Sequence, residues 1–199
     1  QQNTMRTINS LMGMACPKLV WLPNACDPEI HQNCKLNWYN RDRLFGFIGS
    51  VSQSYIRQNR LQILNLIEEL SENSIIIKQN DYPHTEMYKI LNQCKIGLNE
   101  SSLEDINMRS FEIPSYGCLL FTNYIPNNGY EELGFINGAT CLFWDSFEDY
   151  REQVINLINI QDNYDIYDCN IAKAGYLLAI NSHTYKHRVM QILPEIICL

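Results

Sequence analysis

The sequence predicts an α/β protein built on a doubly wound, mostly parallel sheet. From residue 44 onward, short apolar runs alternate with segments of helical periodicity. The runs are continuously apolar and lack the period-two alternation of a sheet with one solvated face, which indicates strands buried on both faces. Glycine and small polar residues follow several of the runs, as expected where strands end in loops.

Each element follows from its local pattern, and the order of strands and helices is typical of a Rossmann-type domain. The predicted strands are 44–48, 74–78, 95–99, 118–122 and 139–144. The predicted helices are 54–71, 83–93, 107–116, 147–159 and 169–192. Pro83 suits the first turn of a helix, and Gly117 suits a helix end. Residues 18–22 are a candidate short strand that ends at Pro23.

Composition limits the class of ligand. The 199-residue chain is 46% hydrophobic and 19% charged, as in an ordinary soluble globular protein. Its formal net charge is -7 with only 15 Lys and Arg, so no basic face for nucleic acid is expected. No apolar stretch reaches the roughly 18 residues of a membrane span. A phosphate would therefore be held locally, by a few arginines and backbone N–H groups, which favours a small anionic ligand.

The eight cysteines show neither a CxxC motif nor a Cys/His pair at metal-ligand spacing. Several lie inside apolar runs, where a free thiol packs as a small apolar side chain. We therefore expect buried free thiols and a reducing, cytoplasmic location rather than a disulfide framework or a zinc site.

Ligands of doubly wound sheets bind beyond the carboxyl ends of the strands. This rule selects the loops 49–54, 79–83, 99–107 and 122–130. Glu104 and Glu112 lie eight positions apart across a loop-to-helix junction. The first-turn N–H groups between them have no intrahelical partner and, with the helix dipole, would bind a diphosphate. Arg109 would add a charge-assisted contact, and Glu112 could accept hydrogen bonds from ribose hydroxyls. On spacing alone, a capped helix start with an exposed arginine is the stronger interpretation.

The string Arg109-Ser-Phe-Glu-Ile-Pro-Ser-Tyr-Gly-Cys-Leu-Leu-Phe-Thr122 resembles the nucleotide-binding signature of CgeB-like glycosyltransferases, which belong with the retaining group 1 enzymes of GT-B fold. These enzymes have two Rossmann-like domains that face each other across a cleft. Other stretches resemble the family in order along the chain: the passage between domains at 21–31, the first C-terminal-domain strand and glycine turn at 47–50, the strand at 88–99 and the closing helix at 183–188.

The resemblance implies that 44–199 is the nucleotide-sugar-binding C-terminal domain and that 1–43 is a linker or remnant of the N-terminal domain. It assigns the ribose to Glu112 and places Glu104 near the transferred sugar, as the candidate catalytic residue. Gly49 and Ser50 would face the phosphates. Arg57 and Arg60 are both candidates for the basic partner there, and Arg60 fits the family spacing better.

Two other residues of the implied site mark a departure from the wider group. That group has a glycine-rich turn where this chain has Ile106-Asn-Met108, so Asn107 and Met108 would offer backbone N–H groups in its place.

Three further features have simpler interpretations than a site. His183 and His187 lie one helical turn apart, but with no third ligand nearby a packed or surface helix is favoured over a metal site. Asp145, Glu148 and Asp149 are expected at the solvated start of a helix. Trp21 and Trp38 flank the proposed linker and are expected to pack in the core.

The resemblance implies an enzyme that transfers a hexose-type sugar with retention of anomeric configuration. The donor would be a nucleotide-diphosphate sugar, with UDP-sugar the leading candidate, and no metal or other cofactor is expected. The acceptor is not readable from the sequence. An N-terminal acceptor-binding domain would come from the same or another chain, because 43 residues are too few for one. The alternative is a non-catalytic nucleotide-sugar-binding module in a regulatory, spore or surface assembly.

Overall fold

The computed structural model describes residues 20–31, 38–51, 58–79, 83–101, 103, 105–160 and 166–197. In this part of the chain, five strands form one sheet in the order β2-β1-β3-β4-β5, and all neighbours are parallel. The strands are β1 (Arg43–Ile48), β2 (Ser74–Ile77), β3 (Cys94–Asn99), β4 (Leu119–Asn123) and β5 (Leu142–Trp144). The predicted Rossmann-like α/β fold is confirmed.

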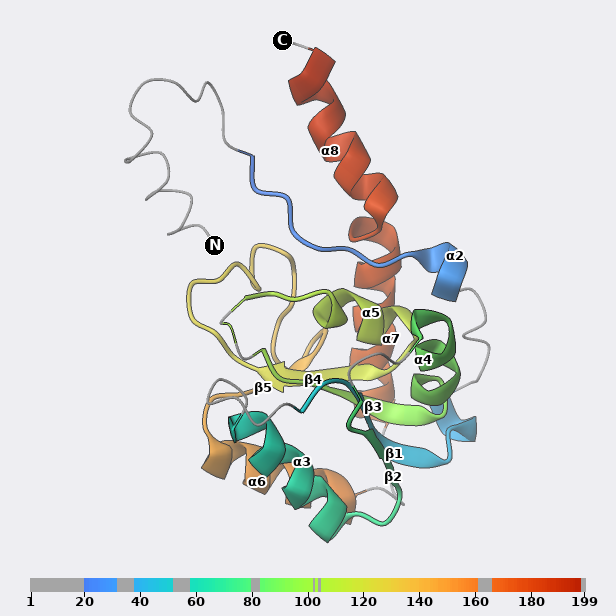
Figure 1. Ribbon diagram of the computed structural model, residues 1–199, viewed down its shortest axis with the longest axis vertical. Coiled ribbons are helices and arrows are strands. Elements are labelled where there is room, and N and C mark those ends of the chain that lie inside the picture. The colour runs from blue at the N-terminus through green and yellow to red at the C-terminus, as the bar shows by residue number, and fades with distance from the viewer. Residues whose placement is uncertain are drawn as a thin grey trace.

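Helices cover both faces of the sheet (Figure 1). They are α2 (Pro28–His31), α3 (Gln58–Leu70), α4 (His84–Leu91), α5 (Arg109–Ser115), α6 (Phe147–Asn159), α7 (Ile166–Ser182) and α8 (Tyr185–Ile197), with a short 3-10 turn at Trp38–Asn40. Helices α3 and α6 pack against one face, α4 and α5 cover the other, and α7 packs against α5 and β4. Apolar side chains alternate between these two layers, as the unbroken apolar strands predict.

The order of the central strands creates a gap at the carboxyl ends of β1 and β3. From β1 the chain passes through α3 to β2 on one side, and after α4 it returns to β3 on the other side of β1. The loops that follow β1 and β3 therefore run in opposite directions from the carboxyl ends of neighbouring strands. Crevices at such a switch point are where open α/β sheets bind ligands.

Helix α5 packs unusually close to the sheet because Gly97 in β3 has no side chain. A Cβ atom at Gly97 would lie only 2.4 Å from Cγ2 of Ile113 in α5, which is far inside van der Waals contact. Gly117 ends this helix with a φ of +75°, a conformation that a glycine adopts at little cost, as predicted. Gly97 thus determines the distance of α5 from the sheet, and Gly117 determines where this helix, which carries Arg109 and Glu112, ends.

Two sequence predictions about the chain termini are wrong. Val20, Trp21 and Leu22 form no strand, and residues 18 and 19 lie outside the described residues. The segment instead packs over the 125–135 loop, where Trp21 occupies the space that a side chain at Gly129 would need. The predicted helix over 169–192 is two helices, α7 and α8, separated at His183 and Thr184.

The break between α7 and α8 is a polar joint with the N-terminal segment. Cys26 and Thr184 form an isolated parallel bridge, and the Cys26 N–H donates to the carbonyl of His183 at 2.8 Å. The Arg188 guanidinium donates to the carbonyls of Pro23 and Asn24 at 3.0 Å and contacts His183 Nδ1 at 2.8 Å. These contacts with the N-terminal segment replace the helical hydrogen bonds lost at the break. Helix α8 then projects from the body of the domain (Figure 1).

The described cysteines bear out the prediction of free thiols. Four of them (Cys26, Cys94, Cys118 and Cys141) are buried, and Cys169 is half-buried. Burial raises the pKa of Cys26 to about 11 and that of Cys141 to about 12, so both are protonated at neutral pH. Cys16, Cys34 and Cys198 lie outside the described residues. Trp38, as predicted, packs in the core. The same prediction for Trp21 is wrong, because Trp21 is half-buried and belongs to neither core cluster.

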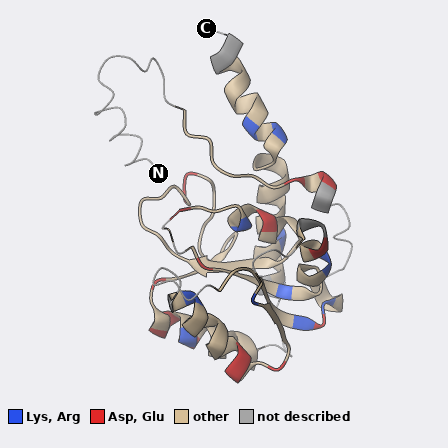
Figure 2. Cartoon of the chain, in the orientation of Figure 1, with Lys and Arg blue, Asp and Glu red and all other residues tan. Residues whose placement is uncertain are grey.

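Charged side chains are distributed over many elements. Figure 2 shows Lys and Arg spread over several helices and strands rather than collected on one face. Among the described residues, none of the helices has the length and apolar character to cross a bilayer.

Gly97→Ala should destabilise the fold by about 1–3 kcal/mol, since the new methyl group overlaps Ile113 in a packed core. Urea unfolding of the single variant, of Ile113→Ala and of the double variant measures the coupling. We expect the double variant to be more stable than the sum of the two single changes, because the smaller residue makes room. Simple additivity would show that the close approach of β3 and α5 is not the cause.

Candidate functional site

A pocket of about 280 Å³ opens between the carboxyl ends of β1 and β3, at the switch point of the sheet. All seven residues predicted to bind the donor line it: Gly49, Ser50, Arg60, Asn107, Met108, Arg109 and Glu112. Phe47 and Asn99 complete the wall. Residues up to 65 positions apart in the sequence therefore meet around one cavity, which we call the switch-point pocket.

The start of α5 is held by a side-chain cap rather than left open. Asn107 Oδ1 accepts a hydrogen bond from the Arg109 N–H at 3.0 Å, and the Asn107 carbonyl accepts from the Ser110 N–H at 3.2 Å. The Phe111 N–H donates to the carbonyl of Met108 at 3.0 Å. The prediction that these first-turn N–H groups await a ligand is wrong, because asparagine two residues before a helix readily forms this cap. The backbone N–H groups of Asn107 and Met108 stay predicted ligand donors, beside the two arginines of the pocket.

Arg109 extends from the first turn of α5 along the pocket wall. Its guanidinium carbon lies 5.9 Å from the centre of the Phe47 ring. A Cβ atom at Gly49 would lie 3.5 Å from that carbon, so glycine keeps the space before the guanidinium open. Burial lowers the pKa of Arg109, the neighbouring Glu112 carboxylate opposes this, and the Arg60 charge adds to it. The guanidinium stays protonated at neutral pH and is a desolvated cation beside a second cation, which favours an anionic ligand.

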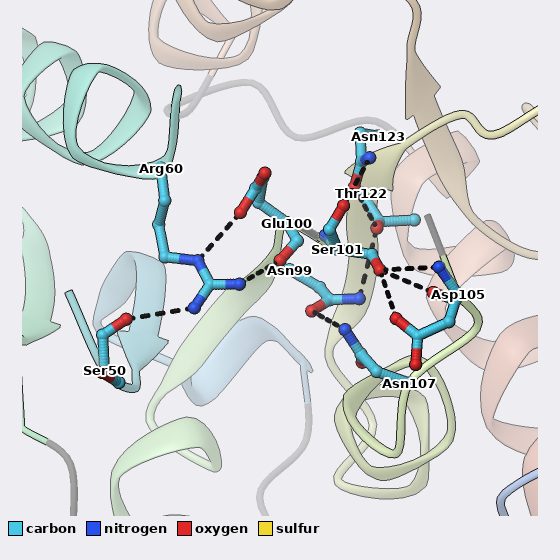
Figure 3. Close-up of polar contacts among 9 residues, drawn as sticks. All are labelled: Ser50, Arg60, Asn99, Glu100, Ser101, Asp105, Asn107, Thr122 and Asn123. Atoms are coloured by element: carbon cyan, nitrogen blue, oxygen red, sulfur yellow. Dashed lines mark hydrogen bonds and ion pairs between the residues drawn. The ribbon is translucent and has the colours of Figure 1, made fainter. Parts of the chain in front are cut away.

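Arg60 is the second cation of the pocket, and three oxygens fix it. From α3 its Nε donates to Glu100 Oε2 at 2.9 Å, and its Nη1 donates to the carbonyl of Ser50 at 3.0 Å (Figure 3). Its Nη2 donates to the carbonyl of Glu100. The guanidinium thus joins the loop after β1 to the end of β3. Its carbon also lies 6.0 Å from the Phe47 ring centre, so both arginines flank one aromatic ring. Arg57, the other candidate, lies outside the described residues.

A buried amide network positions the start of α5. Asn99, at the end of β3, donates through Nδ2 to Ser110 Oγ at 3.2 Å and to Thr122 Oγ1 at 3.3 Å. Its Oδ1 accepts from Asn107 Nδ2 at 3.3 Å (Figure 3). One side chain therefore ties β3 to β4 and to the cap of α5. Because the network is buried and hydrogen-bonded throughout, it holds the pocket wall in one geometry.

Glu112 lies one turn after Arg109 and faces the same pocket, with 6% of its surface exposed. A carboxylate at this depth can accept two directed hydrogen bonds from a pair of ligand hydroxyls. Glu104, the predicted catalytic residue, lies outside the described residues.

Three residues of the site were not predicted from the sequence: Phe47, Asn99 and Glu100. Asn99 and Glu100 follow directly after an apolar strand, inside one of the loops that the strand-end rule selected, and this position was the available signal. The partnership of Glu100 with Arg60 had no signal, because 40 positions separate the two residues.

The remaining sequence candidates have structural roles. His183 Nε2 contacts the carbonyl of Leu133 at 2.7 Å, and His187 Nδ1 contacts Thr184 Oγ1 at 2.7 Å. No cluster of three or more potential metal ligands exists in the described part of the chain. The acidic residues around 145–149 lie at the start of α6, as predicted, where Ser146 Oγ accepts from the Asp149 N–H at 3.1 Å.

The fold agrees with the comparisons to known proteins. The sequence matches the model of a glycosyl transferase-like family over residues 60–194. The chain belongs to this glycosyl transferase-like family. A comparison with curated proteins found no match.

Solved structures with the same fold include several glycosyltransferases. Sucrose-phosphate synthase from Thermosynechococcus elongatus superposes with a TM-score of 0.64 at 11% identity, over 98% of this chain and 56% of that one. The pneumococcal O-GlcNAc transferase GtfA, solved with UDP and GlcNAc, gives 0.59 at 11% identity, over 98% of this chain and 43% of that one. TarM gives 0.55 at 9% identity, over 88% of this chain and 37% of that one. The fold is therefore that of GT-B glycosyltransferases, and the chain spans about half the length of these structures.

Arg60→Met should destabilise the domain by roughly 3 kcal/mol, because Glu100, with its side chain only 9% exposed, loses its charged partner. Adding Glu100→Leu should recover most of that loss, since an apolar pair can replace a buried ion pair. Urea unfolding measures both. Lys89→Met, which breaks an exposed pair with Glu86, is the control and should change stability by less than about 1 kcal/mol. A double variant less stable than Arg60→Met would contradict the expected role of the pair.

Proposed function

We propose that this chain is the nucleotide-sugar-binding half of a CgeB-like, retaining GT-B glycosyltransferase that uses a nucleotide-diphosphate sugar, with UDP-sugar as the leading donor. The observation that carries the proposal is the meeting of Arg60, Arg109 and Glu112 around one pocket at the switch point. Two guanidinium groups suit a diphosphate, and a buried carboxylate one helical turn away suits a pair of ribose hydroxyls.

The charges of the pocket are matched to this ligand. Each arginine already has a neighbouring carboxylate, Glu100 for Arg60 and Glu112 for Arg109. The pocket therefore does not contain two uncompensated cations. A diphosphate would add hydrogen bonds to the Arg60 guanidinium, whose orientation is already fixed by three oxygens, and this reduces the entropy lost on binding.

The same arrangement would serve the reaction. When a sugar leaves a nucleotide diphosphate, negative charge develops on the departing phosphate, and fixed cations stabilise it most where water is excluded. Arg109, half-buried beside Phe47, is the residue best placed for this role. Glu104 would act near the transferred sugar, and a second domain would supply the acceptor site. The free thiols of the described cysteines support a cytoplasmic location.

A UDP donor has one specific support among the similar structures, because the GtfA structure contains UDP and GlcNAc. The alternative is a module that binds the nucleotide sugar without catalysis. The coverage of the similar structures supports this alternative, since the chain spans only 56% of the sucrose-phosphate synthase chain and 43% of the GtfA chain.

Arg109→Ala and Glu112→Ala should each weaken binding of UDP by ~1–3 kcal/mol, the value of one hydrogen bond to a charged group. Isothermal titration calorimetry measures the affinity. Arg151→Ala, an exposed arginine on α6 away from the pocket, is the matched control and should bind as the parent does. Unchanged affinity in both pocket variants would remove the switch-point pocket as the nucleotide site. A thermal-shift screen of UDP, GDP, ADP and their sugars would choose the base, because a bound ligand raises the apparent Tm.

Nucleotide release separates the enzyme from the binding module. We expect this chain, when joined to an acceptor-binding domain, to release UDP or another nucleotide diphosphate from its sugar, and this chain alone to bind the donor with little turnover. Coupled detection of the released nucleotide measures the rate. If the donor binds and neither form releases nucleotide from any common nucleotide sugar, the binding module is the correct interpretation.

A further inference from the structure

A second depression follows the carboxyl edge of the sheet at the ends of β4 and β5. It consists of two hollows of about 240 and 290 Å³ that share Tyr124 and Asp145. The first extends to Glu100 and Phe147, and the second extends to Glu131 and Ile136. We call the pair the edge groove. The Arg60–Glu100 ion pair separates it from the switch-point pocket, because Arg60 lines the pocket and Glu100 lines the groove.

The groove is chemically the opposite of the pocket. Its lining residues include the carboxylates Glu100, Glu131 and Asp145, and none of the described lining residues is Lys or Arg. A phosphate or other anion would be repelled there. The nucleotide diphosphate and the occupant of the groove must therefore be different chemical groups.

Two of the three carboxylates already have donors, which argues against a cationic occupant. Glu100 accepts from Arg60, and Glu131 Oε1 accepts from the Tyr124 hydroxyl at 2.8 Å. Beside them, the exposed amides Asn59 and Gln62 line the first hollow. Each amide offers two donors and an acceptor, which is the combination that hydroxyl groups require.

Aromatic side chains supply the rest of the surface. Phe147 is 39% exposed at the first hollow, and Tyr124 lies between the two hollows with its ring centre 5.4 Å from that of Phe143. Flat aromatic faces beside amides and carboxylates suit a ligand with apolar C–H faces and polar edges. A sugar ring has this form.

We propose that the edge groove binds a neutral saccharide of at least two rings, one ring in each hollow. The two hollows adjoin at Tyr124 and Asp145, an arrangement that suits two linked rings. This saccharide is distinct from the acceptor, whose site the proposed function gives to a second domain, and its binding does not rest on that function. The groove and the switch-point pocket would then hold two different ligands on opposite sides of one ion pair.

NMR titration of the ¹⁵N-labelled chain tests the proposal. The probes are maltose, cellobiose and N-acetyllactosamine, with glucose, glucose 1-phosphate and trilysine for comparison, and UDP is titrated separately. We expect at least one disaccharide to shift the Trp144 indole N–H and amides at 123–147, and to bind more tightly than glucose. Phe147→Ala should weaken this binding about threefold to tenfold, the value of one aromatic contact. Ile155→Ala, which removes an apolar side chain of similar exposure (36%) from α6 outside the groove, should not.

The two proposals fail independently. Arg109→Ala should reduce UDP binding and leave saccharide binding intact, and Phe147→Ala should do the reverse. Saccharide shifts without UDP binding would overturn the proposed function and support the groove. UDP binding with no shift from any of the three disaccharides would overturn the groove alone. Shifts at 123–147 from trilysine or glucose 1-phosphate in place of the disaccharides would also overturn it, in favour of a charged ligand.

Discussion

The parallel pairing of β1 with β3 determines where everything else can lie. These two strands are neighbours in the sheet although β2 and two helices separate them in the sequence. Their pairing brings the glycine turn after β1 next to the polar end of β3 and forces the following loops apart. The switch-point pocket is the space left between those loops. Gly97, in the same pair of strands, then sets how closely α5 and its two charged residues approach the sheet.

Around this gap, positive and negative side chains occupy separate, adjoining parts of the carboxyl edge of the sheet. Moving along the carboxyl edge of the sheet, Arg109 and Arg60 face the pocket, Glu100 follows them, and Asp145 and Glu131 line the groove beyond. The formal net charge of -7 describes none of this order, because opposite charges adjoin and partly neutralise one another. A domain with few basic residues can present a local anion site because burial and aromatic contact with Phe47 hold two guanidinium groups in place.

The elements best predicted from the sequence are those that depend on local patterns. Unbroken apolar runs predicted all five strands of the sheet, and the α6 boundaries at 147 and 159 were predicted correctly. The errors arose where distant residues decide. The α7–α8 break depends on the carbonyls of residues 23 and 24, which lie 165 and 164 positions before Arg188 in the sequence. The occupied N–H groups of α5 are a local exception, because Asn107 lies only two residues before Arg109. Likewise, the seven donor-binding candidates could be selected by motif, whereas Glu100 becomes recognisable only once Arg60 reaches it across the sheet.

The contacts at the break between α7 and α8 connect α8 to the N-terminal segment of the described chain. Arg188 in α8 donates a hydrogen bond to the carbonyl of Asn24. The Asn24 side chain in turn donates to the carbonyl of Ile106 at 3.2 Å, and Ile106 lies one residue before Asn107, which caps α5. A displacement of α8 would therefore reach the wall of the switch-point pocket through these two contacts.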